Sequence, residues 1–307
     1  MLHLKIFFFA LFFLHILFAD IITPLPQKAE YDKIKAELGK KLFFDPILSI
    51  NNTVSCASCH TLPGSGSDLT SYSKGVGGAI GEMNTPTVLN AAYNLAQFWD
   101  GRAKDLQEQA GGPILNPAEM ASTKEHVLKT LNESKRYKKY FYTIYEEALK
   151  FSQVTEVLAE FEKALITPNA PFDNYLRGDT TALTDLEKRG YELFQDKGCI
   201  NCHNGINIGG SMYQKVGIFE KFLGQKGSLG RYNITKDEDD RYTFKVPSLR
   251  NVALTAPYMH DGNTSTLRGM VSKMARLQLG QDIDEKEIEA IVAFLHSLTG
   301  QTPNILK

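Results

Sequence analysis

The chain contains the pattern Cys-x-x-Cys-His twice, and this pattern limits the folds open to it more than any other feature. The two copies use all four cysteines of the chain and consist of Cys56, Cys59 and His60 and of Cys199, Cys202 and His203. Two thiols three positions apart can reach the two vinyl groups of one porphyrin, and the adjacent histidine then presents its imidazole to the iron. The sequence therefore predicts two covalently attached c-type haems.

The first nineteen residues differ from the rest of the chain. Lys5 is followed by an apolar run over residues 6–18, interrupted by His15, and the small residue Ala19 ends the run. These features are typical of a secretory signal peptide, whereas a spanning helix needs about 20 apolar residues. We predict a signal peptide over residues 1–19 and a periplasmic protein. Leu17 is large for a position three before a cleavage point, which leaves an uncleaved anchor open.

Three other uses of paired cysteines suit the sequence less well. A Cys2His set leaves a zinc ion one ligand short. A redox-active pair does not need a histidine in the fifth place of both copies. Export disfavours free thiols but permits disulfides. The duplication of the motif behind an export signal favours haem attachment.

The segments that precede the two motifs resemble each other. Residues 39–45 and 190–196 both read Gly-x-x-Leu-Phe-x-Asp, and each closes an amphipathic helix. Two further helix starts have capping-box spacing, Ser122 with Glu125 and Thr184 with Glu187, and Asp284 with Glu287 offers a looser version of it. No convincing run of alternating strands occurs. The sequence therefore predicts an all-α fold built from repeated units of helix, turn and haem motif.

Length and composition set the domain organisation. At 307 residues the chain exceeds the usual size of one hydrophobic core. The stretch over residues 167–184 is rich in Pro, Gly, Asp and Thr and is the best candidate linker. We predict an N-terminal domain over residues 20–178 and a C-terminal domain over residues 179–307. The formal net charge of -1 gives no broad basic field, so we expect no nucleic-acid partner.

Two longer segments carry a family resemblance. Residues 84–102 read Asn-Thr-Pro-Thr-Val-Leu-Asn-Ala-Ala-Tyr-Asn-Leu-Ala-Gln-Phe-Trp-Asp-Gly-Arg, and residues 244–262 contain Val-Pro-Ser-Leu-Arg-Asn-Val and Tyr-Met-His-Asp-Gly. Both resemble the bacterial dihaem cytochrome c peroxidases, and the likeness covers essentially the whole mature chain. The resemblance implies two cytochrome c-like helical domains. The N-terminal haem reacts with hydrogen peroxide, and the C-terminal haem receives electrons from a small donor protein.

The resemblance also implies the sixth ligand of the C-terminal haem. It places Met274 opposite His203, and a thioether there raises the potential of the haem, which suits electron entry. Met259 and Met270 are local competitors, and packing in the core is the commoner use of a helical methionine. A tyrosine at this position would have suggested the related enzymes that oxidise tryptophan residues of a partner protein.

On the peroxide side, the resemblance implies a catalytic role for Glu119 and Gln109. Cleavage of the O–O bond needs a base that takes a proton from one oxygen and delivers it to the other, and Glu119 is the candidate. Gln109 would hold the substrate oxygen by a hydrogen bond. The resemblance places Trp99, the only tryptophan, between the two haems, where it assists electron transfer or packs the interface.

The family also binds one calcium ion between the haems. The matching ligands in this chain are the side chain of Asn84 and the backbone carbonyl groups of Thr255 and Pro257. Oxygen ligands suit calcium, and this set would tie the two domains together.

One departure from the family concerns the resting state. Many members hold the peroxidatic iron inactive with a histidine, which aligns with Val76 in this chain, and no histidine occurs between His60 and His126. A valine cannot bind iron, so we predict a resting N-terminal haem that is open or holds water and needs no reductive activation. Lys74 or Tyr72 remains an alternative ligand, because alignment in a Gly-rich loop can slip.

The sequence thus predicts a dihaem peroxidase that reduces hydrogen peroxide to water. The electron donor would be a small redox protein such as a monohaem cytochrome c or a cupredoxin, and family members are commonly homodimers. Two alternatives stay open. One is a non-enzymatic dihaem electron carrier, and the other is a related dihaem oxidase of an organic or protein substrate, which the missing histidine favours and Met274 disfavours.

Overall fold

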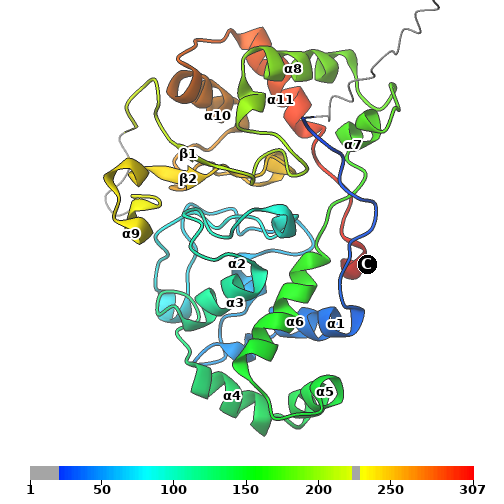
Figure 1. Cartoon of the computed structure of the whole chain (residues 1–307), viewed down its shortest axis with the longest axis vertical. Coiled ribbons are helices and arrows are strands. Elements are labelled where there is room, and N and C mark those ends of the chain that lie inside the picture. The colour runs from blue at the N-terminus through cyan, green and yellow to red at the C-terminus, as the bar shows by residue number, and fades with distance from the viewer. Residues whose placement is uncertain (1–20, 223–228) are drawn as a thin grey trace, which may run out of the picture.

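The computed structural model describes residues 21–222 and 229–307, so the predicted signal peptide at residues 1–19 lies outside the described residues. The chain is largely helical and forms two stacked halves (Figure 1). The helices of the lower half (residues 33–163) are α1 (Lys33–Phe44), α2 (Cys56–Cys59), α3 (Leu106–Leu115), α4 (Lys124–Glu133), α5 (Lys135–Tyr145) and α6 (Phe151–Lys163). The elements of the upper half (residues 171–296) are α7 (Pro171–Leu176), α8 (Asp185–Asp196), β1 (Tyr213–Lys215), α9 (Tyr232–Thr235), β2 (Thr243–Lys245), α10 (Leu267–Met274) and α11 (Glu285–His296).

Short helical turns and one small ribbon complete the architecture. The turns are η1 (Pro46–Leu48), η2 (Val76–Gly78), η3 (Ala91–Tyr93), η4 (Cys199–Asn201), η5 (Glu238–Asp240), η6 (Val252–Leu254), the π-helical η7 (Ala275–Leu279) and η8 (Asn304–Leu306). β1 and β2 pair antiparallel, with Tyr213 opposite Lys245. The predicted all-α class is confirmed. The two-stranded ribbon was not predicted, because strands of three residues are too short to show an alternating pattern in the sequence.

The helix starts agree with the sequence at two of three places. Thr184 caps α8 and Asp284 caps α11, each in a capping box with a glutamate three residues on. The prediction for Ser122 is wrong by one residue. Thr123 caps α4 instead, because its hydroxyl accepts the backbone N–H of His126 at 3.1 Å.

Each half has its own hydrophobic core, and the two chain ends cross between them. Phe172 of α7 packs in the upper core, so the predicted linker over residues 167–184 is partly helical and carries a buried side chain. Ile22 also packs in the upper core, whereas Ile305 near the C-terminus packs in the lower one. In Figure 1 these end segments run beside each other along one side of the molecule. A domain boundary after residue 178 stays a prediction.

The repeated Gly-x-x-Leu-Phe-x-Asp segment has a structural explanation. In the lower half α1 crosses α6, and in the upper half α8 crosses α11 (Figure 1). A Cβ atom added at Gly39 would overlap the carbonyl oxygen of Val157, and one added at Gly190 would overlap that of Ala290. The two glycines therefore let the helix backbones touch, and the same crossing is built twice.

Replacing Gly190 with alanine is expected to lower the free energy of unfolding by about 3 kcal/mol, because the helices must separate to admit the methyl group. Gly111→Ala is the matched control. Gly111 lies in α3, and a Cβ atom added there would be 3.5 Å from Phe151, an ordinary van der Waals distance. Because alanine has the higher helix propensity, the free energy of unfolding should stay the same or rise by up to about 1 kcal/mol. Urea unfolding followed by circular dichroism measures both. Equal stabilities of the two variants would contradict this account of the crossing.

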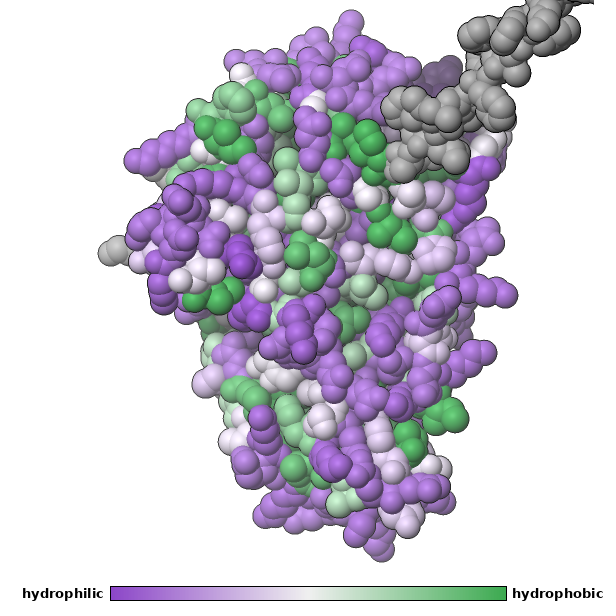
Figure 2. Space-filling model, in the orientation of Figure 1, coloured by the Kyte–Doolittle hydropathy of each residue, from purple (hydrophilic) through white to green (hydrophobic). Residues whose placement is uncertain are grey.

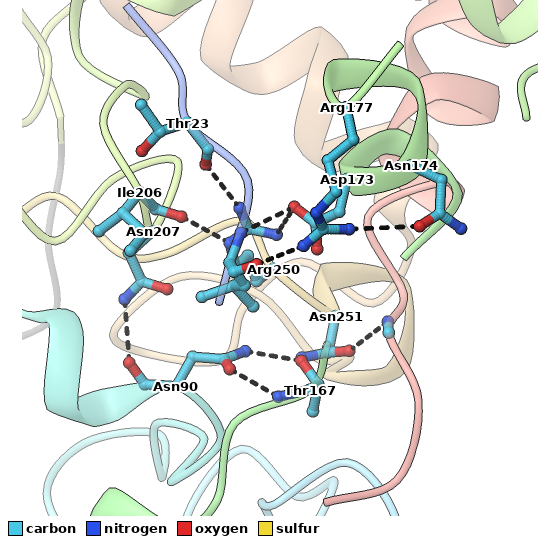
Figure 3. A network of polar contacts seen from close by, with 12 residues as sticks. Thr23, Asn90, Thr167, Asp173, Asn174, Arg177, Ile206, Asn207, Arg250 and Asn251 are labelled. Carbon is cyan, nitrogen blue, oxygen red and sulfur yellow. Dashed lines mark hydrogen bonds and ion pairs between the residues drawn. The ribbon is translucent and has the colours of Figure 1, made fainter. Parts of the chain in front are cut away.

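A buried polar network joins the two halves (Figure 3). Asn90 and Asn251 both follow a proline by four residues and both adopt left-handed backbone, with φ near 60°. Their side-chain N–H groups donate to the same Thr167 hydroxyl, at 2.8 Å and 2.9 Å. One threonine thus fixes equivalent turns of the two halves against each other.

The surface gives no sign of a membrane-spanning element in the part of the chain that the structure describes. No helix within residues 21–222 and 229–307 is long and apolar enough to cross a bilayer. On the face shown in Figure 2, apolar residues lie scattered among polar ones.

Candidate haem sites

The first Cys-x-x-Cys-His motif forms the single helical turn α2. Ser55 and Ser58 cap this turn, and the backbone N–H of Ser55 donates to the Ser58 hydroxyl at 3.0 Å. The backbone N–H of His60 donates to the carbonyl of Cys56 at 2.9 Å. Helical spacing therefore holds the two thiols and the imidazole close together, as attachment of one porphyrin requires.

His60 is prepared to bind a metal through one nitrogen. Its Nδ1 lies 3.0 Å from the carbonyl oxygen of Gly66, which can only accept a hydrogen bond. This contact assigns the proton to Nδ1 and leaves the lone pair on Nε2. Burial lowers the pKa of His60, and the Gly66 carbonyl partly opposes that shift, so the ring is neutral at pH 7.

The second motif repeats the turn of the first, but the Nδ1 atom of His203 is buried and has no hydrogen-bond partner among the described residues. The motif begins with the turn η4, and the backbone N–H of His203 donates to the carbonyl of Cys199 at 3.0 Å. Burial lowers the pKa of His203 to about 4, against the opposing effect of backbone carbonyl groups at Ile208 and Pro247. The imidazole therefore stays neutral and available as a ligand.

The phenylalanine of each repeated segment packs beside the histidine of the following motif. The ring centroids of Phe43 and His60 are 6.3 Å apart, and those of Phe194 and His203 are 6.5 Å apart. The repeat thus supplies both the close helix crossing and one wall of each histidine site.

The thiols do not resemble a redox-active or metal-binding set. All four are free, and burial raises the pKa of Cys56 to about 12 and that of Cys199 to about 11. Reactive thiols and zinc-bound thiols need a lowered pKa. Across residues 21–222 and 229–307, no group of three or more His, Cys, Asp or Glu side chains is arranged to hold a metal ion. The geometry therefore disfavours the zinc and redox interpretations.

A large open cavity, called the upper cavity below, lies beside the second motif, where the upper half faces the lower half. It holds about 1540 Å³ of space that protein atoms do not fill, including the solvent at its mouth, and it is lined by Cys199, Cys202 and His203 and by residues within the segment 84–99 of the lower half. Most of its other lining residues are apolar, as expected for a cofactor site. The second motif therefore has room for its haem.

Three methionines lie along this cavity. Met274 is the last residue of α10, and Met259 and Met270 line the same space. Met274 also packs against a small cluster that contains Met259 and Leu277. The structure thus brings the predicted ligand and both competitors together, and the choice of Met274 stays a prediction.

Glu119 lies beside the first motif, in the turn that follows α3. Its Oε1 accepts a hydrogen bond from the Asn116 side chain at 2.6 Å. Burial is the main cause of the raised pKa of Cys56 and Cys59, and the negative charge of Glu119 adds a small contribution to each. Burial raises the pKa of Glu119 itself, while Asn116 and the positive charge of Arg102 partly oppose this.

Gln109 lies on α3, the helix that precedes the turn of Glu119. Its Oε1 is buried and has no hydrogen-bond partner within the described residues. A buried amide oxygen without a partner is costly, so it marks a place where a further group binds. This observation fits a haem and its substrate beside His60.

The loop that contains Val76 packs directly on Glu119. The backbone N–H of Val76 donates to the carbonyl oxygen of Glu119 at 2.7 Å. Of the two alternative iron ligands, Lys74 has an exposed side chain. Burial raises the pKa of Tyr72, and the negative charge of Asp261 adds to this effect. The position that aligns with the missing histidine therefore lies on the Glu119 side of the site, and valine occupies it.

Trp99 lies where the two halves meet. Its indole N–H donates to the carbonyl of Asn84 at 2.8 Å, and its own carbonyl accepts the backbone N–H of Lys245 at 2.8 Å. Its ring is also part of the wall of the upper cavity. The tryptophan thus belongs to the lower half by sequence and to the upper haem site by position.

The predicted calcium ligands are close to this junction. Asn84, Thr255 and Pro257 all line the upper cavity. The Asn84 side-chain N–H donates to the carbonyl of Thr70 at 2.8 Å, which leaves Oδ1 as the oxygen available to a cation. The three residues border the same cavity, and both the calcium ion and its ligand set stay predictions.

Sequence reasoning missed two residues that affect Glu119. Asn116 holds the Glu119 carboxylate, and Arg102 contributes positive charge while lying over the Phe98 ring at 3.6 Å. Asn116 could have been found from its spacing, because a side chain three residues before an acid in a turn commonly bonds to it. Arg102 pairs with Asp100 in the segment that carries the family resemblance, and its electrostatic effect on Glu119 depends on the tertiary fold.

The sequence matches known families over most of its length. Residues 33–181 match the family described as "Di-haem cytochrome c peroxidase", and residues 187–299 match "Cytochrome c". A cytochrome c peroxidase of Escherichia coli is 48% identical over 91% of this chain, although the chain spans only 61% of that protein. A cytochrome c551 peroxidase of Nitrosomonas europaea is 46% identical, with 92% of this chain and 85% of that protein covered.

A solved structure has the same fold. A MauG-like protein associated with microbial copper homeostasis superimposes with a TM-score of 0.80 at 25% identity, over 91% of this chain and 93% of that one. The matches confirm the two predicted c-type haems and the cytochrome-like helical fold. By these similarities in sequence and fold, the chain belongs to the dihaem cytochrome c peroxidase family.

Proposed function

We propose that this protein is a periplasmic peroxidase that reduces hydrogen peroxide to water with electrons from a small redox protein, such as a monohaem cytochrome c or a cupredoxin. Family membership makes it an oxidoreductase that acts on peroxide. The observation that carries the finer proposal is the half-buried Glu119 carboxylate beside the first motif, with the unpartnered oxygen of Gln109 in the same region. The apolar N-terminal run supports export.

Each motif would hold one haem. Cys56 and Cys59 would form the thioether bonds of the first haem, with His60 as its iron ligand. Cys199 and Cys202 would attach the second haem, and His203 and Met274 would be its iron ligands. When bound, the haem at the first motif would supply the redox chemistry for peroxide, and the haem at the second would supply a higher-potential site for electrons from the donor.

The protein side of the reaction is proton transfer. Glu119 takes the proton from one peroxide oxygen and gives it to the other as the O–O bond breaks, so that one water leaves. Two electrons and two further protons complete the conversion of one peroxide to two waters. Asn116 fixes the carboxylate at 2.6 Å, and Gln109 holds the substrate by a hydrogen bond. Electrons pass Trp99 between the two halves.

The calcium ion and the dimer are further parts of the proposal. Asn84 with the carbonyl groups of Thr255 and Pro257 would bind calcium where the lower and upper halves meet, and the ion would brace Trp99 through the Asn84 carbonyl. The family resemblance supports a homodimer.

The purified protein with both haems tests the function directly. Peroxide is expected to oxidise a reduced small cytochrome c catalytically, which stopped-flow absorbance measures. An electron carrier would react with the cytochrome but not turn over with peroxide. An oxidase of organic or protein substrates would instead consume peroxide with those substrates and leave the cytochrome reduced.

The oxidised protein is expected to be active without prior reduction. Val76 cannot bind iron, so electron paramagnetic resonance should show a high-spin ferric signal in the fully oxidised protein. Val76→His is expected to convert that signal to low-spin and to make activity depend on prior reduction, since the Val76 backbone is anchored on Glu119 at 2.7 Å. Ala79→His in the same loop is the control. A wild-type protein without the high-spin signal would sink the open-site hypothesis.

A further inference from the structure

Two buried nitrogen-bearing side chains in the upper cavity have no assigned role. Lys245 on β2 is only 7% exposed, and His260 is 2% exposed. Both line the cavity beside the second motif. The Nε2 atom of His260 is buried and has no hydrogen-bond partner among the described residues. Such a group in a native protein needs a partner.

The charge of this cavity is unbalanced. Among the described residues that line it, Lys245 is the only lysine or arginine, and none is an aspartate or glutamate. Burial lowers the pKa of Lys245 to about 8, and no acidic neighbour opposes the shift. A buried cation of this kind is costly unless an anion joins it. The cavity therefore suits a ligand that carries negative charge at one end.

We propose that Lys245 and His260 bind the propionate groups of the haem attached at Cys199 and Cys202. Propionates leave a porphyrin on the side away from its two thioether bonds, so they need partners elsewhere on the cavity wall. The Lys245 ammonium would pair with one carboxylate, and the His260 Nε2–H would donate a hydrogen bond. The proposal rests on the haem attachment proposed above but not on peroxide reduction.

The surroundings hold both side chains in place. The His260 ring stacks on Phe244 with centroids 4.1 Å apart and meets the edge of Trp99 at 6.2 Å. The backbone N–H of Lys245 donates to the carbonyl of Trp99 at 2.8 Å. The propionate site would therefore lie at the same junction as the tryptophan, so Lys245 would set the potential of the haem that feeds it.

A redox titration of the protein with both haems attached tests this. Removing the cation in Lys245→Met leaves the propionates unpaired and favours the ferric state. The equilibrium constant for reduction of the higher-potential haem is expected to fall at least tenfold, which is about 59 mV for one electron. Lys245→Arg should retain most of the wild-type potential. Lys215→Met, on the exposed face of the paired strand β1, removes the same charge and should shift the constant less than twofold.

His260→Phe gives a second readout that packing alone would not move. It keeps an aromatic ring against Phe244 but removes the N–H donor, so the resonance Raman bending mode of the propionates should shift to lower frequency. This variant decides the matter if Lys245→Met does not fold. Equal potentials in Lys245→Met and Lys215→Met, or an unchanged propionate mode in His260→Phe, would overturn the proposal. Mass spectrometry of the haem-bearing protein shows separately whether attachment has failed.

Discussion

Replacing Glu119 with glutamine is expected to slow peroxide reduction by between about 10² and 10⁴-fold while both haems remain attached. The amide keeps the shape of the side chain and its contact with Asn116, but it cannot take a proton from peroxide. The loss should fall on kcat/KM for peroxide, because the proton moves in the step that breaks the O–O bond. Stopped-flow oxidation of a reduced cytochrome measures it.

The pH profile separates proton transfer from a structural effect. Burial raises the pKa of Glu119 above its ordinary 4.5. The carboxylate is the form that accepts the proton, so the wild-type rate should rise with pH through that raised pKa, and this limb should vanish in Glu119→Gln. Glu133→Gln, exposed at the end of α4, should leave rate and profile unchanged. A variant of Glu119 that keeps the wild-type rate would remove the carboxylate from the mechanism.

Local spacing explains what could be read from the sequence alone. The haem motifs each lie within five residues, so the helical turn at Cys56 and the turn at Cys199 bring thiols and histidine together without help from the rest of the fold. The repeated Gly-x-x-Leu-Phe-x-Asp segment was visible for the same reason. The structural role of this segment could not be predicted, because Gly39 and Gly190 allow close helix crossings with Val157 and Ala290, which lie more than 90 residues away in the sequence.

The features of the fold and of the site that the sequence did not predict depend on contacts between distant residues or on very short elements. Lys245 and His260 become a pair only when β2 and the turn before α10 close on one cavity. The crossing of the chain ends could not be foreseen either, since Ile22 and Ile305 each pack on the half to which they do not belong by sequence order. The helix cap at Thr123 shows the remaining limit, because two adjacent hydroxyl residues offer the same local signal.

Replacing Arg250 with methionine is expected to lower the free energy of unfolding by about 3 to 5 kcal/mol. Arg250 and Asp173 form an ion pair at 2.9 Å with side chains only 1% and 0% exposed (Figure 3). The guanidinium also donates to the carbonyl groups of Ile206 and Thr23. Its removal leaves a buried carboxylate without its cation, whereas methionine fills much of the same volume. Urea unfolding of the protein with both haems measures the loss.

The control is Arg136→Met, which removes the exposed partner of Asp45 and should cost less than about 1 kcal/mol. Adding Asp173→Asn to Arg250→Met should restore part of the stability, because the stranded charge is what costs most. A loss as small as that of Arg136→Met would contradict the argument. Since Asp173 Oδ1 also accepts the backbone N–H of Leu25 at 3.1 Å, the same carboxylate holds the N-terminal segment on the upper half. Hydrogen exchange at Leu25 should therefore quicken in the Arg250 variant before the helices around the upper core lose protection.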